Sequence, residues 1–358
     1  MNREDDNVPP TPAPTPQSPT GPPPNPNMGQ AYPPPPVPPE GPVAKQRRRG
    51  PRPVPPGVPY HRVLSREKRM IWRGIAALAL LMGGMFAFSI ALSLLGAFID
   101  LALGRSSFLL GGDEFTPVSQ ATMLLSLALL LPWSMLIQRW LYGVKGASLH
   151  SVRSLFRYEV FGRALLVILP IWTVYLGIFQ LLGGSQEVPW RFTDLIGMFV
   201  VVILFAPMQS AAEEYSFRGL AFRVAASWGK GPRVALGLGV VVSSLLFMTA
   251  HVTLDPWLNL YYFTMGVTLT LITWRTGGLE IAVVIHAVNN VIAFLLPVVT
   301  HSDFTEGMER SVGTGSVIML VPCVLLAVIT AVVWRRTRKV GPLRTEEDSA
   351  RVPVFEQG

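Results

Sequence analysis

Long apolar segments occupy most of this chain from residue 71 onward and constrain its fold more than any other feature. Each is long enough to cross a hydrocarbon layer about 30 Å thick. The eight candidate spans are residues 71–100, 119–139, 160–183, 194–216, 234–252, 257–275, 279–299 and 316–334. Half of the 358 residues are hydrophobic and only 15% are charged, as in a multi-spanning membrane protein. The sequence predicts an all-α, polytopic membrane helical bundle of about eight transmembrane helices over residues 71–334.

The charges between these spans predict the orientation of the chain. Basic residues gather in alternate loops and in the C-terminal tail, whereas the opposite loops are mainly acidic. The basic groups are Arg139, Lys145, Arg153 and Arg157; Arg218, Arg223, Lys230 and Arg233; and Arg335, Arg336, Arg338 and Lys339. Lysine and arginine favour the cytoplasmic side of a membrane. We therefore expect a multi-pass protein of the cell membrane with both termini in the cytoplasm, as an even number of spans requires.

The segment before the first span differs from the rest of the chain. Residues 1–60 hold 22 of the 33 prolines and little that could form a core. Such a tract cannot repay the entropy of ordering, so we expect residues 1–65 to be a disordered, Pro-rich cytoplasmic tail. It is a spacer or a ligand for an unknown Pro-binding partner. The first apolar run begins near Ile71, too late and too long for a secretory signal peptide. A second cytoplasmic tail is predicted at 335–358.

Basic residues and the cysteine content limit the partners and the chemistry. Ten basic side chains lead into the first span: Lys45, Arg47, Arg48, Arg49, Arg52, Arg62, Arg66, Lys68, Arg69 and Arg73. We interpret them as a juxtamembrane stretch that faces anionic lipid, and expect no nucleic acid as a partner. The single cysteine, Cys323, excludes a disulfide within the chain and a Cys-based zinc site.

A pair of carboxylates, Glu213 and Glu214, follows the apolar run 198–208, and Arg218 comes four residues later. A charged side chain within a bilayer costs about 2.5–3.5 kcal/mol on insertion scales, so such groups mark functional sites. Residues four apart share a helix face, which predicts that Glu214 pairs with Arg218. Glu213 points about 100° away and is left free. We therefore predict that Glu213 is a general base that takes a proton from water.

Two further polar pairs occur at helical spacing in apolar surroundings. His251 follows Phe247 by four residues, and Asn290 follows His286 by four. His286 and Asn290 share a face and can both donate hydrogen bonds to an oxyanion. Alternatively, the two histidines and a glutamate can hold zinc with one open position. Asn289 competes with Asn290 for this role, and Phe247 is interpreted as a cavity wall.

The order of these three patterns resembles a known family. Glu-Glu-x-x-x-Arg at 213–218, Phe-x-x-x-His at 247–251 and His-x-x-x-Asn at 286–290 are similar to the three motifs of the CPBP family. That family contains the CAAX prenyl endopeptidases and the Abi-type bacterial relatives linked to bacteriocin self-immunity. The resemblance covers about residues 190–300, including the small-residue context 217–219, and no other part of the chain.

The resemblance implies an intramembrane endopeptidase that cuts a membrane protein or a lipidated peptide. By position, Glu213 activates water with help from His251, while His286 and Asn290 stabilise the tetrahedral oxyanion. The supporting residues are Glu214, Arg218 and Phe247. Hydrolysis is either metal-free or assisted by zinc held by Glu213, His251 and His286, since both mechanisms place water opposite a scissile carbonyl.

The sequence is less compatible with the other protease classes than with two non-proteolytic functions. The chain lacks His-Glu-x-x-His, Gly-x-Gly-Asp and Gly-x-Ser-Gly, which other intramembrane proteases use. A non-catalytic membrane scaffold or immunity protein would keep the bundle without the chemistry. A transporter with a buried ion relay would use the same charged residues, but the halves of this chain show no internal repeat.

Overall fold

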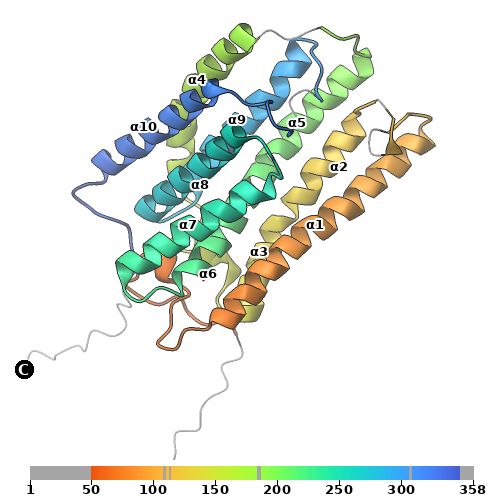
Figure 1. The fold of residues 1–358 in the computed structure, drawn as a ribbon. Coiled ribbons are helices and arrows are strands. Elements are labelled where there is room, and N and C mark those ends of the chain that lie inside the picture. The colour runs from red at the N-terminus through yellow and green to blue at the C-terminus, as the bar shows by residue number, and fades with distance from the viewer. Residues whose placement is uncertain (1–49, 108–109, 113, 184–186, 306–308, 347–358) are drawn as a thin grey trace, which may run out of the picture. The chain divides into compact units, whose positions relative to one another are not determined.

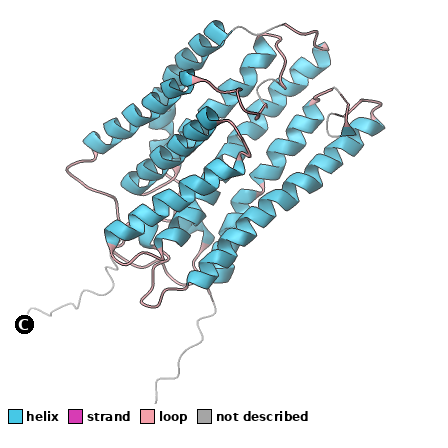
Figure 2. Cartoon of the chain, in the orientation of Figure 1, coloured by secondary structure: helices cyan, strands magenta, loops and turns pink. Residues whose placement is uncertain are grey.

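The computed structural model describes residues 50–107, 110–112, 114–183, 187–305 and 309–346. These residues fold as helices joined by loops and contain no β-strand, only isolated bridges (Figures 1 and 2). The α-helices are α1 (Ile71–Ala102), α2 (Pro117–Ala128), α3 (Leu130–Ile137), α4 (Tyr158–Gly183), α5 (Phe192–Glu213), α6 (Phe222–Ala226), α7 (Pro232–Ala250), α8 (Pro256–Thr276), α9 (Glu280–Val299) and α10 (Leu320–Arg336). Two π-helices, η3 (Gln138–Tyr142) and η5 (Glu214–Ala221), and three short 3₁₀ helices, η1 (Tyr60–Arg62), η4 (Gly146–Leu149) and η7 (Val317–Met319), complete the described part.

The prediction of a polytopic helical bundle is confirmed. Within the described residues, seven continuous helices are long and apolar enough to cross a membrane: 71–102, 117–142, 158–181, 192–226, 232–250, 280–299 and 317–336. The remaining predicted span, 257–275, forms α8, which is a helix of 21 residues but is not among the seven. Its threonines and Asn259 dilute the apolar run. Thr268 and Thr270 donate hydrogen bonds to carbonyls of their own helix, and their side chains are buried within the bundle.

Helix α5 lies at the centre of the packing. It packs against α2 on one side and α9 on the other, and α9 also contacts α4. A second group is formed by α7, α8 and α10, with α8 between the other two (Figure 1). This arrangement places the polar motifs of α5, α7 and α9 in one region of the bundle.

Residues 50–65 correct one boundary that the sequence suggested. We predicted a disordered tail over 1–65, but Tyr60, Val63 and Leu64 are buried in the bundle. The Tyr60 hydroxyl donates to the carbonyl of Leu149 at 2.6 Å. The predicted tail rested on the number of prolines. It did not take into account that Tyr60, Val63 and Leu64 could be buried against distant loops. The rest of that prediction, residues 1–49, lies outside the described residues.

The loops divide into two sets that gather at opposite ends of the helices. We call one set the terminal face, because it includes both ends of the described chain; its loops are 50–70, 143–157, 227–231, 277–279 and 337–346. Isolated bridges link these loops at Arg52 and Val144, Pro59 and Arg344, and Ser151 and Gly278. The other set, the distal face, comprises the described residues of 103–116, 187–191, 251–255, 300–305 and 309–316. Its loops are joined by the Glu187–Ser302 bridge and by the hydrogen bond from the Leu254 amide to the Arg310 carbonyl.

A buried ion pair fixes the start of α9. Arg157 bonds both oxygens of Glu280, at 2.8 Å from Nε and 2.6 Å from Nη2, and the Glu280 side chain is fully buried. We expect Glu280→Ala to destabilise the protein by about 3–5 kcal/mol, because it leaves the largely buried Arg157 without its counter-ion. The exposed pair of Arg163 and Glu159 on α4 is the matched control, and Glu159→Ala should change stability little. Thermal unfolding of both variants in one detergent measures the difference; equal effects would contradict the prediction.

Candidate functional site

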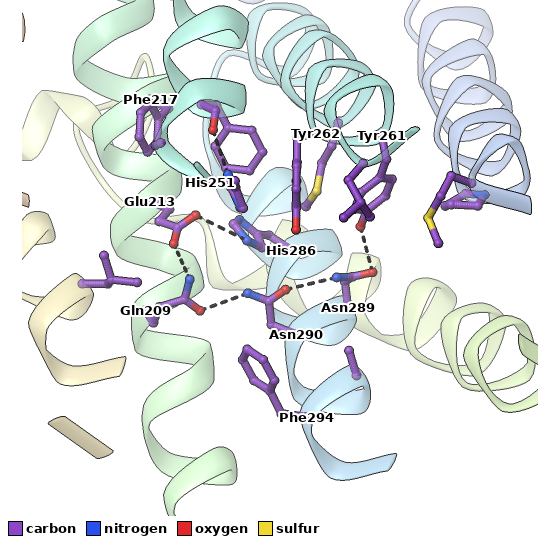
Figure 3. Close-up of a pocket in the computed structure, with 18 of the residues that line it drawn as sticks. Gln209, Glu213, Phe217, His251, Tyr261, Tyr262, His286, Asn289, Asn290 and Phe294 are labelled. Atoms are coloured by element: carbon purple, nitrogen blue, oxygen red, sulfur yellow. Dashed lines mark hydrogen bonds and ion pairs between the residues drawn. The ribbon is translucent and has the colours of Figure 1, made fainter. Parts of the chain in front are cut away.

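A cavity of about 450 Å³ is lined mainly by α4, α5, α7, α8 and α9, with single residues from α1, α2 and α10. Its wall includes the four residues that the sequence selected for catalysis, which are Glu213, His251, His286 and Asn290 (Figure 3). The three motifs are far apart in the sequence, and the structure brings them together. Glu214 and Arg218 do not line the cavity; they lie behind it and are fully buried.

The helix that carries the glutamates is longer than the sequence indicated. We expected it to end near residue 216, close to the cytoplasm. Instead α5 continues through η5 and α6 to Ala226, so Glu213 lies thirteen residues before the end of the helix. At 1.5 Å per residue this is about 20 Å. His251 caps the far end of the 19-residue α7, and the long glutamate helix brings Glu213 to a comparable depth.

The change from α- to π-helix falls between the two glutamates. Glu213 is the last residue of α5 and Glu214 the first of η5. A π-helix contains a wider turn and is frequently found at functional sites. At this junction the Glu214 side chain lies in the core, where it contacts His286 of α9, while Glu213 lines the cavity.

His286 lies between the two carboxylates. Its Nδ1 is 2.7 Å from Glu214 Oε1, and its Nε2 is 3.7 Å from Glu213 Oε2. Because an ionised carboxylate only accepts hydrogen bonds, we assign a proton to Nδ1, which donates a hydrogen bond to Glu214. The second nitrogen therefore faces Glu213 across a distance longer than a hydrogen bond.

The predicted pairing of Glu214 with Arg218 is present in the structure. Arg218 Nη1 lies 3.0 Å from Glu214 Oε1, with both side chains fully buried. Arg218 Nη2 donates to the carbonyl of Met265 at 3.2 Å, and its guanidinium lies 3.8 Å from the centre of the Phe247 ring. Phe247 is thus a cavity wall, as predicted, and also a cation–π partner of the buried arginine.

Glu213 has a partner that the sequence reasoning missed. We expected a free carboxylate, but Oε1 accepts a hydrogen bond from Gln209 Nε2. The other oxygen, Oε2, accepts no hydrogen bond from any described residue. Gln209 also accepts a hydrogen bond of 3.0 Å from Asn290 Nδ2, so it links two of the predicted site residues. The signal was available, because Gln209 precedes Glu213 by four residues on one helix face.

The two neighbouring asparagines have different surroundings. Asn290 donates to Gln209 and accepts from Asn289 Nδ2 at 3.1 Å. Asn289 Oδ1 accepts from Trp172 Nε1 at 3.1 Å and from the Tyr261 hydroxyl at 3.3 Å. Asn289 therefore joins α9 to α4 and α8, whereas Asn290 belongs to the group around Glu213 (Figure 3).

His251, at the end of α7, lines the cavity beside Phe247 and Tyr262. Its Nδ1 is 2.8 Å from the carbonyl of Phe247, and its ring stacks on Tyr262 with centroids 3.8 Å apart. Since a carbonyl only accepts, Nδ1 carries the proton of the neutral ring, and Nε2 is left as an acceptor. This is the tautomer that a proton-accepting histidine needs.

Asp255 holds the loop that follows His251. Its Oδ1 caps α8 by accepting from the amides of Trp257 and Leu258 at 2.8 and 2.9 Å, and its Oδ2 accepts from the Gly313 amide at 3.0 Å. These hydrogen bonds, that of Leu258 foremost, hold the pKa of Asp255 below its usual range. The charged carboxylate thereby joins two loops of the distal face beside the cavity.

The predicted zinc ligands do not form a metal centre in this arrangement. Among the described residues, no three His, Cys, Asp or Glu side chains are grouped so that they could hold a metal ion. Nδ1 of His286 is engaged by Glu214 and Nδ1 of His251 by a backbone carbonyl, which leaves Nε2 of each ring available. Because Glu213, His251 and His286 are not grouped as a ligand set among the described residues, we derive no step through a metal. Zinc assistance stays a prediction.

Comparison with known proteins locates the family resemblance. Residues 192–292 match the model of the type II CAAX prenyl endopeptidase Rce1-like family, from the start of α5 to α9. This part of the chain is an Rce1-like domain. It contains all seven residues that the sequence selected. The match supports an intramembrane protease at the level of the family, in a multi-pass membrane protein.

The Rce1-like domain is also similar to a curated bacterial protein. The chain is 29% identical over 114 residues to the uncharacterised protein YyaK of Bacillus subtilis (strain 168), which covers 31% of this chain and 38% of that protein. The chain thus matches well under two thirds of the relative's length. No solved structure matches the chain.

The buried pair behind the cavity of the Rce1-like domain generates a stability prediction. Arg218→Met should destabilise the protein by about 3–5 kcal/mol, because Glu214 loses its counter-ion in the core. Adding Glu214→Gln should recover part of this loss, since the double variant contains no unpaired charge there. Thermal unfolding of the two single variants and the double variant gives the coupling. Strictly additive effects would show that the two side chains do not interact.

Proposed function

We propose that the chain is an intramembrane endopeptidase that hydrolyses a peptide bond of a membrane-associated or lipidated substrate with water activated by a glutamate. One observation carries this proposal. In a single cavity, Glu213 has an oxygen without a hydrogen-bond partner among the described residues, and it faces His286 and Asn290. The family match to CAAX prenyl endopeptidases supports the same reaction class.

Glu213 is assigned the role of general base. Its Oε2 accepts a proton from a water molecule, and the hydroxide attacks the scissile carbonyl carbon. Gln209 holds the other oxygen, which fixes the orientation of the carboxylate. The acceptor nitrogen of His251, which lines the same cavity, assists. The C–N bond then breaks, and the proton held by Glu213 passes to the leaving amine.

His286 and Asn290 are assigned to the oxyanion. Asn290 uses one amide hydrogen on Gln209 and retains a second for the substrate. Glu214 accepts a hydrogen bond from Nδ1 of His286, which fixes the ring so that Nε2, when protonated, can donate to the tetrahedral oxygen. Arg218 neutralises the negative charge of Glu214. It therefore supports the site without contacting the substrate.

The cellular location and the orientation are part of this proposal. The chain spans a membrane several times, and we place it in the cell membrane with both termini in the cytoplasm. The number of basic residues supports this orientation. The loops of the terminal face contain twelve lysines and arginines against two acidic residues, Glu67 and Glu346.

The first test of the function uses the isosteric variant Glu213→Gln. We expect it to lower the cleavage rate of a susceptible peptide by at least about 10²-fold, because the amide cannot accept a proton from water. Purified protein in detergent is assayed on a panel of fluorogenic peptides and membrane protein fragments. Glu159→Gln, the same change at an exposed position of α4, is the control and should leave the rate unchanged.

The outcomes of this assay separate the candidate functions. Cleavage that survives Glu213→Gln would contradict the assigned base. Loss of cleavage on adding a zinc chelator would restore the metal-assisted alternative. A folded wild-type protein that cuts none of the panel would favour the non-catalytic scaffold or immunity reading.

The adjacent asparagines provide a matched test of the oxyanion role. Asn290→Ala should lower kcat by about 10²–10³-fold with little change in KM, because the lost donor acts mainly in the transition state. Asn289→Ala removes the contacts to Trp172 and Tyr261 and should act mainly on thermal stability. Steady-state kinetics and unfolding of both variants are compared. A larger loss of kcat in Asn289→Ala would reverse the assignment.

A further inference from the structure

A row of side-chain amides on the cavity wall leads to Glu213 (Figure 3). It consists of Asn289, Asn290 and Gln209. Asn289 Nδ2 donates to Asn290 Oδ1 at 3.1 Å, and Asn290 Nδ2 donates to Gln209 Oε1 at 3.0 Å. Gln209 Nε2 in turn donates to Glu213 Oε1. Each amide therefore accepts a hydrogen bond on one side and donates one on the other, and the chain of donors ends at the candidate base.

The groups at the two ends of this row require the same direction. The oxygen and the nitrogen of an amide have nearly the same shape, so their partners define which is which. At one end, the indole N–H of Trp172, which can only donate, bonds Asn289 Oδ1 at 3.1 Å. At the other end, an ionised Glu213 only accepts, so Gln209 presents its nitrogen there. The Ser210 hydroxyl donates to Gln209 Oε1 at 3.2 Å, which agrees with this direction.

Gln209 therefore defines the state of both of its neighbours. The side chain is only 5% exposed, which holds its amide in place. Its nitrogen occupies Oε1 of Glu213, and Oε2 accepts no hydrogen bond from any described residue. Its oxygen occupies one N–H of Asn290 and leaves the second for the substrate. A single amide thus determines which oxygen of Glu213 is open to water and which hydrogen of Asn290 is open to an oxyanion.

We propose that Gln209 is a positioning residue for hydrolysis, which directs the proton from water to Oε2 of Glu213 and aligns the amide of Asn290 with the oxyanion. It acts through these two side chains and not on the reacting atoms. This inference rests on the proposed function, which supplies the roles of Glu213 and Asn290. Asn289 lies farther from Glu213. Since Glu213 sets the direction of Gln209 and then of Asn290, their orientation persists without Asn289, which agrees with a mainly structural role for that residue.

The kinetic test uses Gln209→Met, which keeps the length of the side chain and removes its hydrogen-bonding groups. We expect kcat to fall by about 10–10²-fold, because the base and the oxyanion donor are no longer aligned. KM should change by less than about twofold, since the lost alignment matters mainly in the transition state. The assay uses purified protein in detergent and the same fluorogenic peptides. An unchanged kcat in a folded Gln209→Met protein would overturn the inference.

The matched control is the same substitution at Gln138, a buried glutamine of η3 that does not line the cavity. Its amide donates to the Lys145 carbonyl at 3.0 Å and to the Ser148 hydroxyl at 2.9 Å. Gln138→Met should lower the temperature of thermal unfolding and leave kcat unchanged. Equal losses of kcat in the two variants would show a general effect of removing a buried amide, and would overturn the positioning role.

Gln209→Glu is a second variant of the same size, in case the methionine disturbs folding. Its oxygens still accept from Asn290, but an ionised carboxylate does not donate to Glu213 and repels it. We expect kcat to fall at least as far as in Gln209→Met. A wild-type kcat in this variant would show that the bond to Glu213 has no part in catalysis.

A double-mutant cycle with Asn290→Ala tests whether Gln209 acts through Asn290. The double variant should lose less kcat than the product of the two single losses, because both changes remove the same alignment. Losses that multiply would overturn this part of the inference. Thermal unfolding of the same variants measures the coupling of the two side chains without requiring activity. Coupling in a protein that cleaves no peptide would count against the proposed function alone, whereas cleavage without coupling would count against this inference alone.

Discussion

The site depends on how one buried carboxylate, Glu214, is neutralised. Two adjacent glutamates in a helix core repel one another and are costly to desolvate. Glu214 meets this cost by contacting Arg218 at 3.0 Å and the Nδ1 proton of His286 at 2.7 Å. Arg218 in turn rests on Phe247 and on the carbonyl of Met265. One ion therefore ties η5, α7, α8 and α9 together, and Glu213 can face the cavity because its neighbour supplies the structural contacts.

One helical segment presents both glutamates, at the point where the α-helix becomes a π-helix. Neighbouring side chains point about 100° apart around a helix, so Glu213 and Glu214 face different sides. The His286 ring lies between the two side chains, with Nδ1 near Glu214 and Nε2 near Glu213. The contact of Nδ1 with Glu214 fixes the orientation of the His286 ring, so that Nε2 stays directed toward Glu213.

Sequence reasoning recovered the motifs because each of them follows a local rule. Spacing of four predicted the Glu214–Arg218 contact, and apolar runs predicted seven helices that the structure contains. It failed where a contact is long-range. Tyr60 is buried by Leu149 and Arg223, and no local pattern in a Pro-rich segment reports such partners. Gln209 was missed although its spacing to Glu213 was visible, because an uncharged amide in an apolar run gives no electrostatic signal. The end of the glutamate helix at Ala226 was misplaced because buried arginines resemble loop charges.

Some residues of the cavity wall lie inside the part of the chain that matches the family, and others lie outside it. The polar groups that would perform hydrolysis all lie within residues 192–292, the part that matches the Rce1-like family. Much of the apolar wall comes from outside it: Met85 of α1, Leu127 of α2, Phe179 of α4 and Pro322 of α10. A pocket selects apolar groups by shape at about 1–3 kcal/mol per methylene, so these side chains are where substrates would be discriminated. The chemistry can thus be common to a family, while the choice of substrate would depend on helices that the family match does not include.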